Sequence, residues 1–226
     1  NVIRGNAAPN VFAGGRGDDT YVVKAGDRVV ELSGDGTDTI ETTDSYQLGA
    51  NLENLTLLNG GLTIGVDDIR LTGNELNNVI TGNRASNVLD GGVGADVLAG
   101  GGGDDLYIID NVGDTVVEGL SAGSDTVRSL VDFTLGANVE VLDLSLGIAQ
   151  SGTGNEWDNS LYGNDGDNVL DGGAGNDYLA GGLGSDTYLF GRGSGRDTVQ
   201  DTVPGEVNTI LMAPDVAPGD VVLTTG

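Results

Sequence analysis

The sequence predicts an all-β fold, a right-handed parallel β-roll or β-solenoid, and three observations lead to this prediction. A nine-residue repeat recurs along the chain, and each copy ends in a short apolar segment of strand type. Glycine is very frequent, with 41 residues against 4 prolines, so the turns need the backbone freedom of glycine. Acidic residues number 35 against 9 basic ones, and most of them are Asp placed beside glycine.

The clearest copies of the repeat follow one another without a gap. Residues 91–99 read G-G-V-G-A-D-V-L-A and residues 100–108 read G-G-G-G-D-D-L-Y-I, so the pattern is G-G-x-G-x-D-x-U-x, with U a large apolar residue. The segment x-U-x predicts a short strand whose central side chain points inward, and the six residues before it predict a turn. Two units then form one coil, and turns two units apart stack about 4.8 Å apart.

The repeats gather in three blocks, which predict six segments of the chain. The segments are a first block at residues 1–40, a connecting β segment at 41–72, a second block at 73–128, a connecting β segment at 129–153, a third block at 154–203, and the start of a segment that follows the repeats at 204–226. The connectors either continue the solenoid as wider coils or form separate hairpins, and we favour continuation. Because the chain starts at Asn1 without Met, we expect it to be part of a longer protein.

The composition narrows the classes of function. The chain has no Cys and no His, which excludes disulfides, a zinc protease site of the H-E-x-x-H type, and Ser-His or Cys-His nucleophiles. We therefore expect no enzyme activity in this region. The net charge of −26 and the lack of a basic stripe argue against nucleic acid as a partner, and no apolar run is long enough to span a membrane. Oxygen is the plentiful ligand atom, which points to a hard cation such as Ca²⁺.

On these motifs, the chain resembles the repeats-in-toxin (RTX) family, whose hemolysin-type glycine–aspartate nonapeptides form a calcium-binding parallel β-roll. In that family, an ion is held between two turns that lie one coil apart. One turn gives the Asp and the carbonyls of positions two and four, and the other gives its own Asp and the carbonyls of positions one and three. The resemblance implies several Ca²⁺ ions here, about six to ten by ligand counting.

The same resemblance assigns candidate ligands to this sequence. The pairs, with their backbone ligands in parentheses, are Asp19 with Asp38 (Gly15, Gly17), Asn87 with Asp105 (Asn83, Ala85, Gly100, Gly102), Asp96 with Asp114 (Gly92, Gly94), Asp105 with Asp125 (Gly101, Gly103), Asn168 with Asp186 (Asn164, Gly166, Gly181, Leu183), and Asp177 with Asp197 (Gly173, Gly175). The pairs Asn10–Asp27, Asn78–Asp96 and Asn159–Asp177 are expected to be weaker or empty, because an amide replaces one carboxylate. Each of these Asn residues is either a weak ligand or a hydrogen-bonding cap on the first coil.

Three tyrosines close the blocks at the apolar position of the repeat. Tyr21, Tyr107 and Tyr188 either fill the core where the regular coils end or stack on a sugar. We expect the core role, because this position points inward.

The resemblance also implies a function: a module that calcium folds, in a bacterial protein exported by type I secretion and located outside the cell or on its surface. With one large apolar residue in nine, we expect the calcium-free chain to be largely disordered. Two alternatives remain open. One is a self-assembling adhesin, surface-layer or matrix module, which light scattering tests. The other is a carbohydrate-binding accessory module that contacts polysaccharide, which a glycan array tests.

Overall fold

The computed structural model describes residues 1–60, 69–120, 122–148, 150–200, 205–214 and 216–217. Within these ranges the chain forms short strands joined by turns, and none of the described residues is helical. It follows that no described segment is a helix able to cross a membrane. The chain divides into two compact units, residues 1–127 and 128–226, and each is described by itself.

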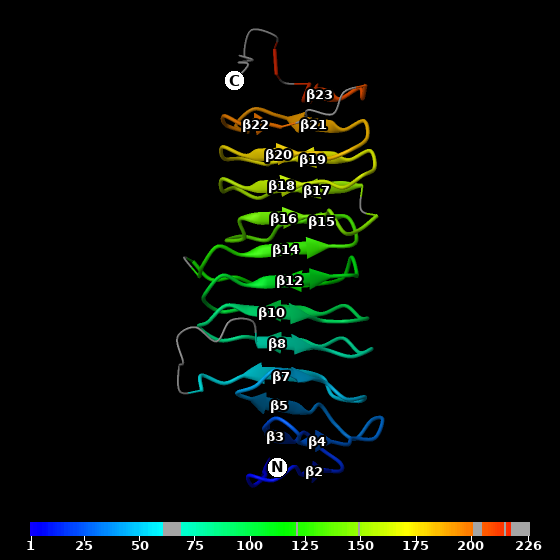
Figure 1. Cartoon of the computed structure of the whole chain (residues 1–226), viewed down its shortest axis with the longest axis vertical. Coiled ribbons are helices and arrows are strands. Elements are labelled where there is room, and N and C mark those ends of the chain that lie inside the picture. The colour runs from blue at the N-terminus through cyan, green and yellow to red at the C-terminus, as the bar shows by residue number, and fades with distance from the viewer. Residues whose placement is uncertain (61–68, 121, 149, 201–204, 215, 218–226) are drawn as a thin grey trace. The chain divides into compact units, whose positions relative to one another are not determined.

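The described residues of the first unit form thirteen strands, and a fourteenth begins at its end. Figure 1 labels several of them. The strands are β1 (Val2–Arg4), β2 (Val11–Phe12), β3 (Thr20–Val23), β4 (Arg28–Val29), β5 (Thr39–Thr42), β6 (Tyr46–Gln47), β7 (Asn54–Leu57), β8 (Ile69–Thr72), β9 (Val79–Thr81), β10 (Asn87–Asp90), β11 (Val97–Ala99), β12 (Leu106–Ile109), β13 (Thr115–Val116) and β14 (Thr126–Ser129). The odd-numbered strands form a sheet ordered β1-β3-β5-β7-β9-β11-β13, strands β6-β8-β10-β12 lie in a second sheet, and β2 pairs with β4 in a third.

Strand pairing in the first unit is parallel and follows the nonapeptide. Val88 of β10 pairs with Leu106 of β12, and Val97 of β11 pairs with Thr115 of β13, so one coil consists of two units of nine residues. The first connecting segment belongs to the same stack, because β7 pairs in parallel with both β5 and β9. The described residues of this connector, 41–60 and 69–72, therefore include strands that stack in parallel with those of the repeat blocks.

The second unit repeats this arrangement with nine further strands. They are β15 (Phe133–Thr134), β16 (Val141–Asp143), β17 (Ser151–Thr153), β18 (Ser160–Tyr162), β19 (Val169–Asp171), β20 (Tyr178–Ala180), β21 (Thr187–Phe190), β22 (Thr198–Val199) and β23 (Thr209–Met212). The sheet orders are β16-β18-β20-β22 and β15-β17-β19-β21-β23. Strand β23 lies in the segment predicted to follow the repeats, yet it pairs in parallel with β21 and so adds another strand to the stack.

The core of each unit is a stack of side chains from the apolar position of the repeat. Leu89, Leu98, Leu170 and Leu179 are fully buried, as are the connector residues Leu55 and Leu142. Tyr21, Tyr107 and Tyr188 are buried to the same degree, which confirms the core role and places their rings out of reach of a sugar. In the regular repeats each nonapeptide adds one large side chain to this stack, whereas the connectors add more, among them Leu52 and Leu57. The hydrophobic contribution of the regular repeats to stability is therefore small for their length.

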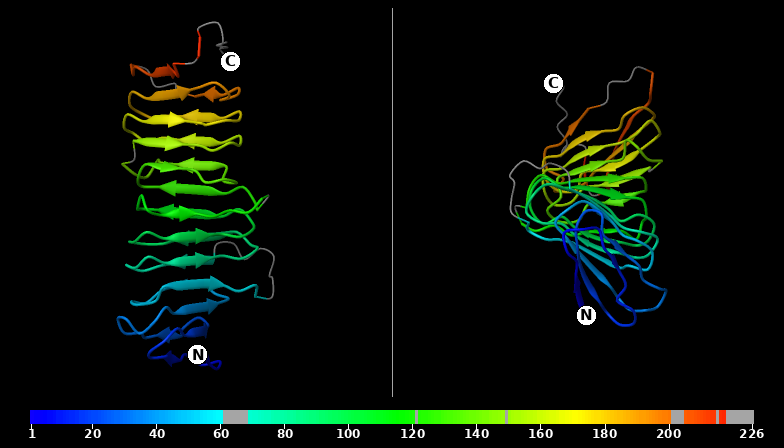
Figure 2. Two further views of the ribbon diagram at one scale, coloured as in Figure 1. Left: turned by 180° about the vertical axis from the view of Figure 1, so that it is seen from behind. Right: turned by 60° about the horizontal axis from the view of Figure 1, so that its bottom comes forward.

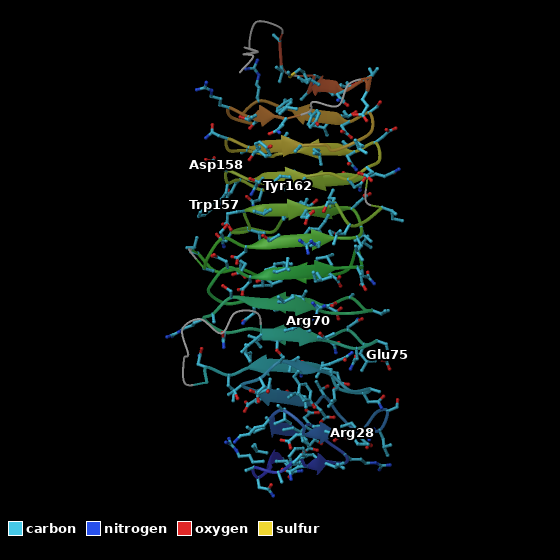
Figure 3. The ribbon with its side chains drawn as sticks, in the orientation of Figure 1. Arg28, Arg70, Glu75, Trp157, Asp158 and Tyr162 are labelled. Atoms are coloured by element: carbon cyan, nitrogen blue, oxygen red, sulfur yellow. The ribbon has the colours of Figure 1, made fainter. Side chains whose placement is uncertain are left out.

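The turns collect along the two edges of the strand stacks in each unit (Figure 2). In the second unit, Trp157 and Asp158 lie at a turn edge, where Trp157 is 39% exposed, whereas Tyr162 lies on a strand (Figure 3).

Glycine is required where stacked turns touch. Gly101 has a φ of +105°, and a Cβ there would collide with the carbonyl oxygen of Asn83 in the coil before it. Neighbouring turns thus bring backbone oxygens of two coils close together.

Candidate metal sites in the turns

The structure places the two residues of every predicted pair in neighbouring coils. In each pair, Oδ1 of the second residue accepts a hydrogen bond from the backbone N–H of the first. The N···O distances are 2.9 Å for Asp19–Asp38, 2.6 Å for Asn87–Asp105, 2.9 Å for Asp96–Asp114, 2.9 Å for Asp105–Asp125, 2.8 Å for Asn168–Asp186 and 2.9 Å for Asp177–Asp197. The pairing is therefore seen in the structure, whereas the role of these residues as ligands stays a prediction.

Most of these carboxylates are buried although they lie in turns. Asp19, Asp96, Asp105 and Asp177 are each at most 2% exposed, and in each of them Oδ2 accepts no hydrogen bond from the described residues. A buried carboxylate oxygen without a partner carries a large desolvation cost. A cation placed between the coils would meet these oxygens and offset that cost.

Burial shifts the acidity of the same groups. Burial, together with the nearby carboxylates of Asp125 and Glu118, raises the pKa of Asp105 to about 7. Burial likewise raises the pKa of Asp96 and of Asp177 to about 6. The internal turns thus hold carboxyl groups that resist ionisation unless positive charge is supplied.

Backbone oxygens converge on the same turns. The position-four carbonyls of Gly17, Ala85, Gly103, Gly166 and Gly175 face a glycine of the next coil. A Cβ at Gly82 would collide with both the Gly100 carbonyl oxygen and Asn87 Oδ1, which shows that oxygens from two coils face one point. The position-two carbonyls of Asn83 and Asn164 accept hydrogen bonds from Gly102 N and Leu183 N, at 2.8 and 3.2 Å. The other predicted carbonyl ligands lie in the same turns, and their role stays a prediction: Gly15, Gly92, Gly94, Gly101, Gly102, Gly173 and Gly181.

The first coils of the second and third blocks are closed by asparagine amides. Asn78 Nδ2 donates to the carbonyl oxygens of Leu52 and Glu53, at 3.0 and 3.2 Å. Asn159 Nδ2 donates to the carbonyl oxygen of Val139 at 2.9 Å. These amides satisfy carbonyls of the preceding connector, which supports the cap in both blocks. In the first block, Asn10 N donates to Asp27 Oδ1 at 2.8 Å, so this pair is stacked as well.

Sequence reasoning missed several acidic and amide side chains that also accept hydrogen bonds from backbone N–H groups of the stacked turns. Glu53 accepts a hydrogen bond from Asp38 N at 2.8 Å, and Asn208 accepts one from Asp186 N at 2.7 Å. Both precede a strand as the repeat Asp does: N-T-I-L at 208–211 parallels D-T-Y-L at 186–189. Glu206 accepts from Gly184 N at 2.9 Å and keeps a buried Oε2 without a hydrogen bond. Comparison of strand-flanking tetrapeptides, rather than of whole nonapeptides, would have identified Asn208.

The donor set fits calcium. Carboxylate, amide and main-chain oxygens converge at the turns, and oxygen is the ligand atom that Ca²⁺ prefers. Orphaned oxygens of Asp19, Asp96, Asp105 and Asp177 supply negative charge at buried points, where a divalent cation gains most.

In calcium-free buffer, lowering the pH from about 7.5 to about 5 is expected to strengthen the folded state. The pKa values of Asp96, Asp105 and Asp177 are about 6 to 7 in the folded chain, whereas an unfolded Asp titrates near 3.9. Between these values the folded chain binds more protons than the unfolded chain, so stability falls as the pH rises through this window. Circular dichroism in resin-treated, calcium-free buffer should show more β signal at the lower pH.

Calcium must displace those protons, so its affinity is expected to fall over the same pH interval. Light scattering serves as the control, because a chain with a pI near 4.1 can aggregate as its charge is lost. A β signal in calcium-free buffer that stays constant or grows as the pH rises would show that the buried carboxyl groups do not govern folding.

Comparison with known proteins agrees with this geometry. The chain is 42% identical over 78 residues to the endo-1,3-1,4-beta-glycanase ExsH of Rhizobium meliloti (strain 1021). That match covers 34% of this chain and 15% of the relative. A family model described as RTX calcium-binding nonapeptide repeat (4 copies) matches residues 1–30, 72–107 and 153–188, and these ranges contain both residues of the stacked pairs Asn87–Asp105 and Asn168–Asp186. The chain therefore contains RTX calcium-binding nonapeptide repeats, which lie in a parallel β-solenoid.

Proposed function

We propose that this chain is a structural module that calcium folds, within a bacterial protein exported by type I secretion. The observation that carries this proposal is the set of buried carboxylate oxygens, in Asp19, Asp96, Asp105 and Asp177, that accept no hydrogen bond from any residue that the structure describes. A folded chain without cations keeps these oxygens unsatisfied, and a folded chain with calcium pairs them. Folding and calcium binding are then one equilibrium.

The balance of forces supports this view. The net charge is −26, and each regular nonapeptide adds one large side chain, such as Leu89 or Leu98, to the core. About eight Ca²⁺ ions would cancel about 16 negative charges, by ordinary ligand counting. Such ions supply positive charge between the coils, which the chain itself lacks. Each Asp of the repeat then has two roles: Oδ1 accepts the N–H of the preceding coil, and Oδ2 faces the cation.

In our proposal, the need for calcium determines that the protein folds outside the cell. The scarce calcium of the cytosol would leave the chain extended and suited to export, and millimolar calcium outside would fold it. The three repeat blocks, at 1–40, 73–128 and 154–203, would each bind ions, and the connectors at 41–72 and 129–153 would space them. The name of the matched relative, an endo-glycanase, concerns a protein of which only 15% aligns with this chain. We propose that the aligned repeats contribute folding rather than catalysis.

Calorimetric titration of the chain with calcium tests the proposal. We expect about six to ten ions per chain, with half-saturation at about 0.1–1 mM, the range of extracellular calcium modules. Circular dichroism recorded along the same titration should rise with calcium over the same range. A stoichiometry of one or none, or full β structure before calcium is added, would contradict the proposed function.

A further inference from the structure

The end of the second repeat block holds a third carboxylate that the nonapeptide pattern does not contain. Asp105 precedes β12, Glu118 follows β13 and Asp125 precedes β14. Each of the three offers an oxygen within 4.8 Å of the others. Two of these residues belong to the predicted pair between stacked turns, whereas Glu118 comes from the irregular coil that ends the block.

A buried tyrosine fixes Glu118 in this position. Tyr107 is 0% exposed, and its hydroxyl donates a hydrogen bond to Glu118 Oε1. The same hydroxyl accepts a hydrogen bond from Gly100 N at 2.7 Å, so its donor direction is set by the turn. An oriented phenol thus holds the Glu118 carboxylate toward the inside of the coil rather than toward solvent.

The buried carboxylate of Asp105 points into the same place. Asp105 is 2% exposed, and its Oδ2 accepts no hydrogen bond from the described residues. A Cβ at Gly100 would collide with both Asp105 Oδ2 and the Tyr107 hydroxyl, so these two oxygens face one point. The buried Oδ2 of Asp105 lies beside two further carboxylates, so the negative charge at this point is greater than in a site with two carboxylates. A bound cation would therefore lower the electrostatic energy more here than in a site with two carboxylates.

We propose that Glu118 is a third carboxylate ligand, and that the end of the second block is a distinct cation site that binds more tightly than the two-carboxylate sites. This inference rests on the proposed function, because it assumes that stacked turns bind calcium. This site would bind a hard cation of high charge. Three carboxylates favour trivalent lanthanides over Ca²⁺ more strongly than two carboxylates do. Tyr107 contributes by positioning Glu118.

The first block contains a related arrangement. The Tyr21 hydroxyl donates to Glu31 Oε1, and Gly14 N donates to the same oxygen at 3.0 Å. Glu31 is 5% exposed and precedes Asp38 by the same spacing as Glu118 precedes Asp125. Charge from Glu31 contributes to raising the pKa of Asp38, which burial raises first. A tyrosine-held glutamate at the end of a repeat block is therefore a feature that occurs twice in this chain.

The experiment is a terbium titration of the wild-type chain and of Glu118→Gln, with luminescence sensitised by tyrosine and reversed by calcium. We expect the first-filled, Tyr107-sensitised class of sites to weaken roughly tenfold in Glu118→Gln, because ligand charge tunes affinity. Asp104→Asn is the matched control. Asp104 is exposed on the same turn and lies outside the cluster, and an asparagine there keeps the oxygen that accepts a hydrogen bond from Ser124 N at 2.9 Å. This variant loses equal charge and should weaken terbium binding far less than Glu118→Gln does.

Two further measurements separate the possible outcomes. Tyr107→Phe should remove the sensitised emission of the first-filled class, and circular dichroism in saturating calcium should show that each variant folds. Equal affinities for Glu118→Gln and Asp104→Asn, in folded chains, would overturn this inference and leave the proposed function intact. If the wild-type chain bound neither terbium nor calcium, the proposed function would fall as well.

Discussion

Removal of calcium is expected to abolish most of the β-sheet circular dichroism of this chain, and addition of calcium should restore it. The folded coils bury the carboxylates of Asp96, Asp105 and Asp177 without a partner for Oδ2. At neutral pH these groups must either stay protonated or hold unpaired charge, because burial raises the pKa of each to about 6 or 7. Far-ultraviolet spectra in excess EGTA, and then in excess calcium, measure the change.

Two controls distinguish coordination from general charge screening. Salt at about 1 M shortens the Debye length to about 3 Å and screens the exposed acids, but it does not reach buried oxygens. We therefore expect salt with EGTA to restore little of the β signal. Magnesium at equal concentration should also restore little, because it holds its water ligands strongly and needs octahedral geometry. A β spectrum unchanged in excess EGTA would refute the proposal that calcium folds the chain.

The second large effect is expected from Asp105→Asn. Asp105 belongs to two stacked pairs, since its Oδ1 accepts the N–H of Asn87 and its own N–H donates to Asp125. The amide keeps an oxygen for the first hydrogen bond but loses the charge that two adjacent sites share. In calcium, we expect the free energy of unfolding to fall by about 3–5 kcal/mol, the size seen when one partner of a buried charged pair is removed. Calorimetry should count fewer ions.

Asp104→Asn is again the natural comparison, because it makes the same chemical change at the neighbouring, exposed residue. Its effect should stay within about 0.5 kcal/mol. In calcium-free buffer, Asp105→Asn should not destabilise the chain, because it removes a buried charge that opposes folding. If denaturation in calcium showed equal losses of unfolding free energy for Asp105→Asn and Asp104→Asn, the proposed role of Asp105 as a shared ligand would be contradicted.

Much of the fold follows from the sequence, because the repeat fixes both the strand and the spacing. Leu89 and Leu98 were expected to point inward, and both are fully buried. Two units of nine set one coil, which brings Asn87 and Asp105 together as predicted. Where paired strands are not two nonapeptides apart in the sequence, the repeat no longer predicts the register. Asn54 of β7 lies 15 residues after its partner Thr39 in β5 and 25 residues before its partner Val79 in β9, so the register of β7 comes only from the structure.

The candidate sites were predictable only in part. The stacking of turns two units apart follows from the repeat, and the family resemblance then assigned the Asp pairs, whereas the Asn78 amide could equally have served as a weak ligand or a cap. Its contacts with the Leu52 and Glu53 carbonyls depend on how the first connector lies against the second block. Glu118 was missed for a similar reason, since it belongs to an irregular coil and is positioned by the hydroxyl of Tyr107. Neither contact has a fixed sequence offset that a repeat pattern can supply.

The most direct test is a crystal structure grown in calcium, with anomalous scattering used to locate the ions. We predict anomalous density between the stacked turns that carry Asn87 and Asp105, and between those that carry Asp105 and Asp125. Ordered coils in millimolar calcium, with no such density between those turns, would contradict the account.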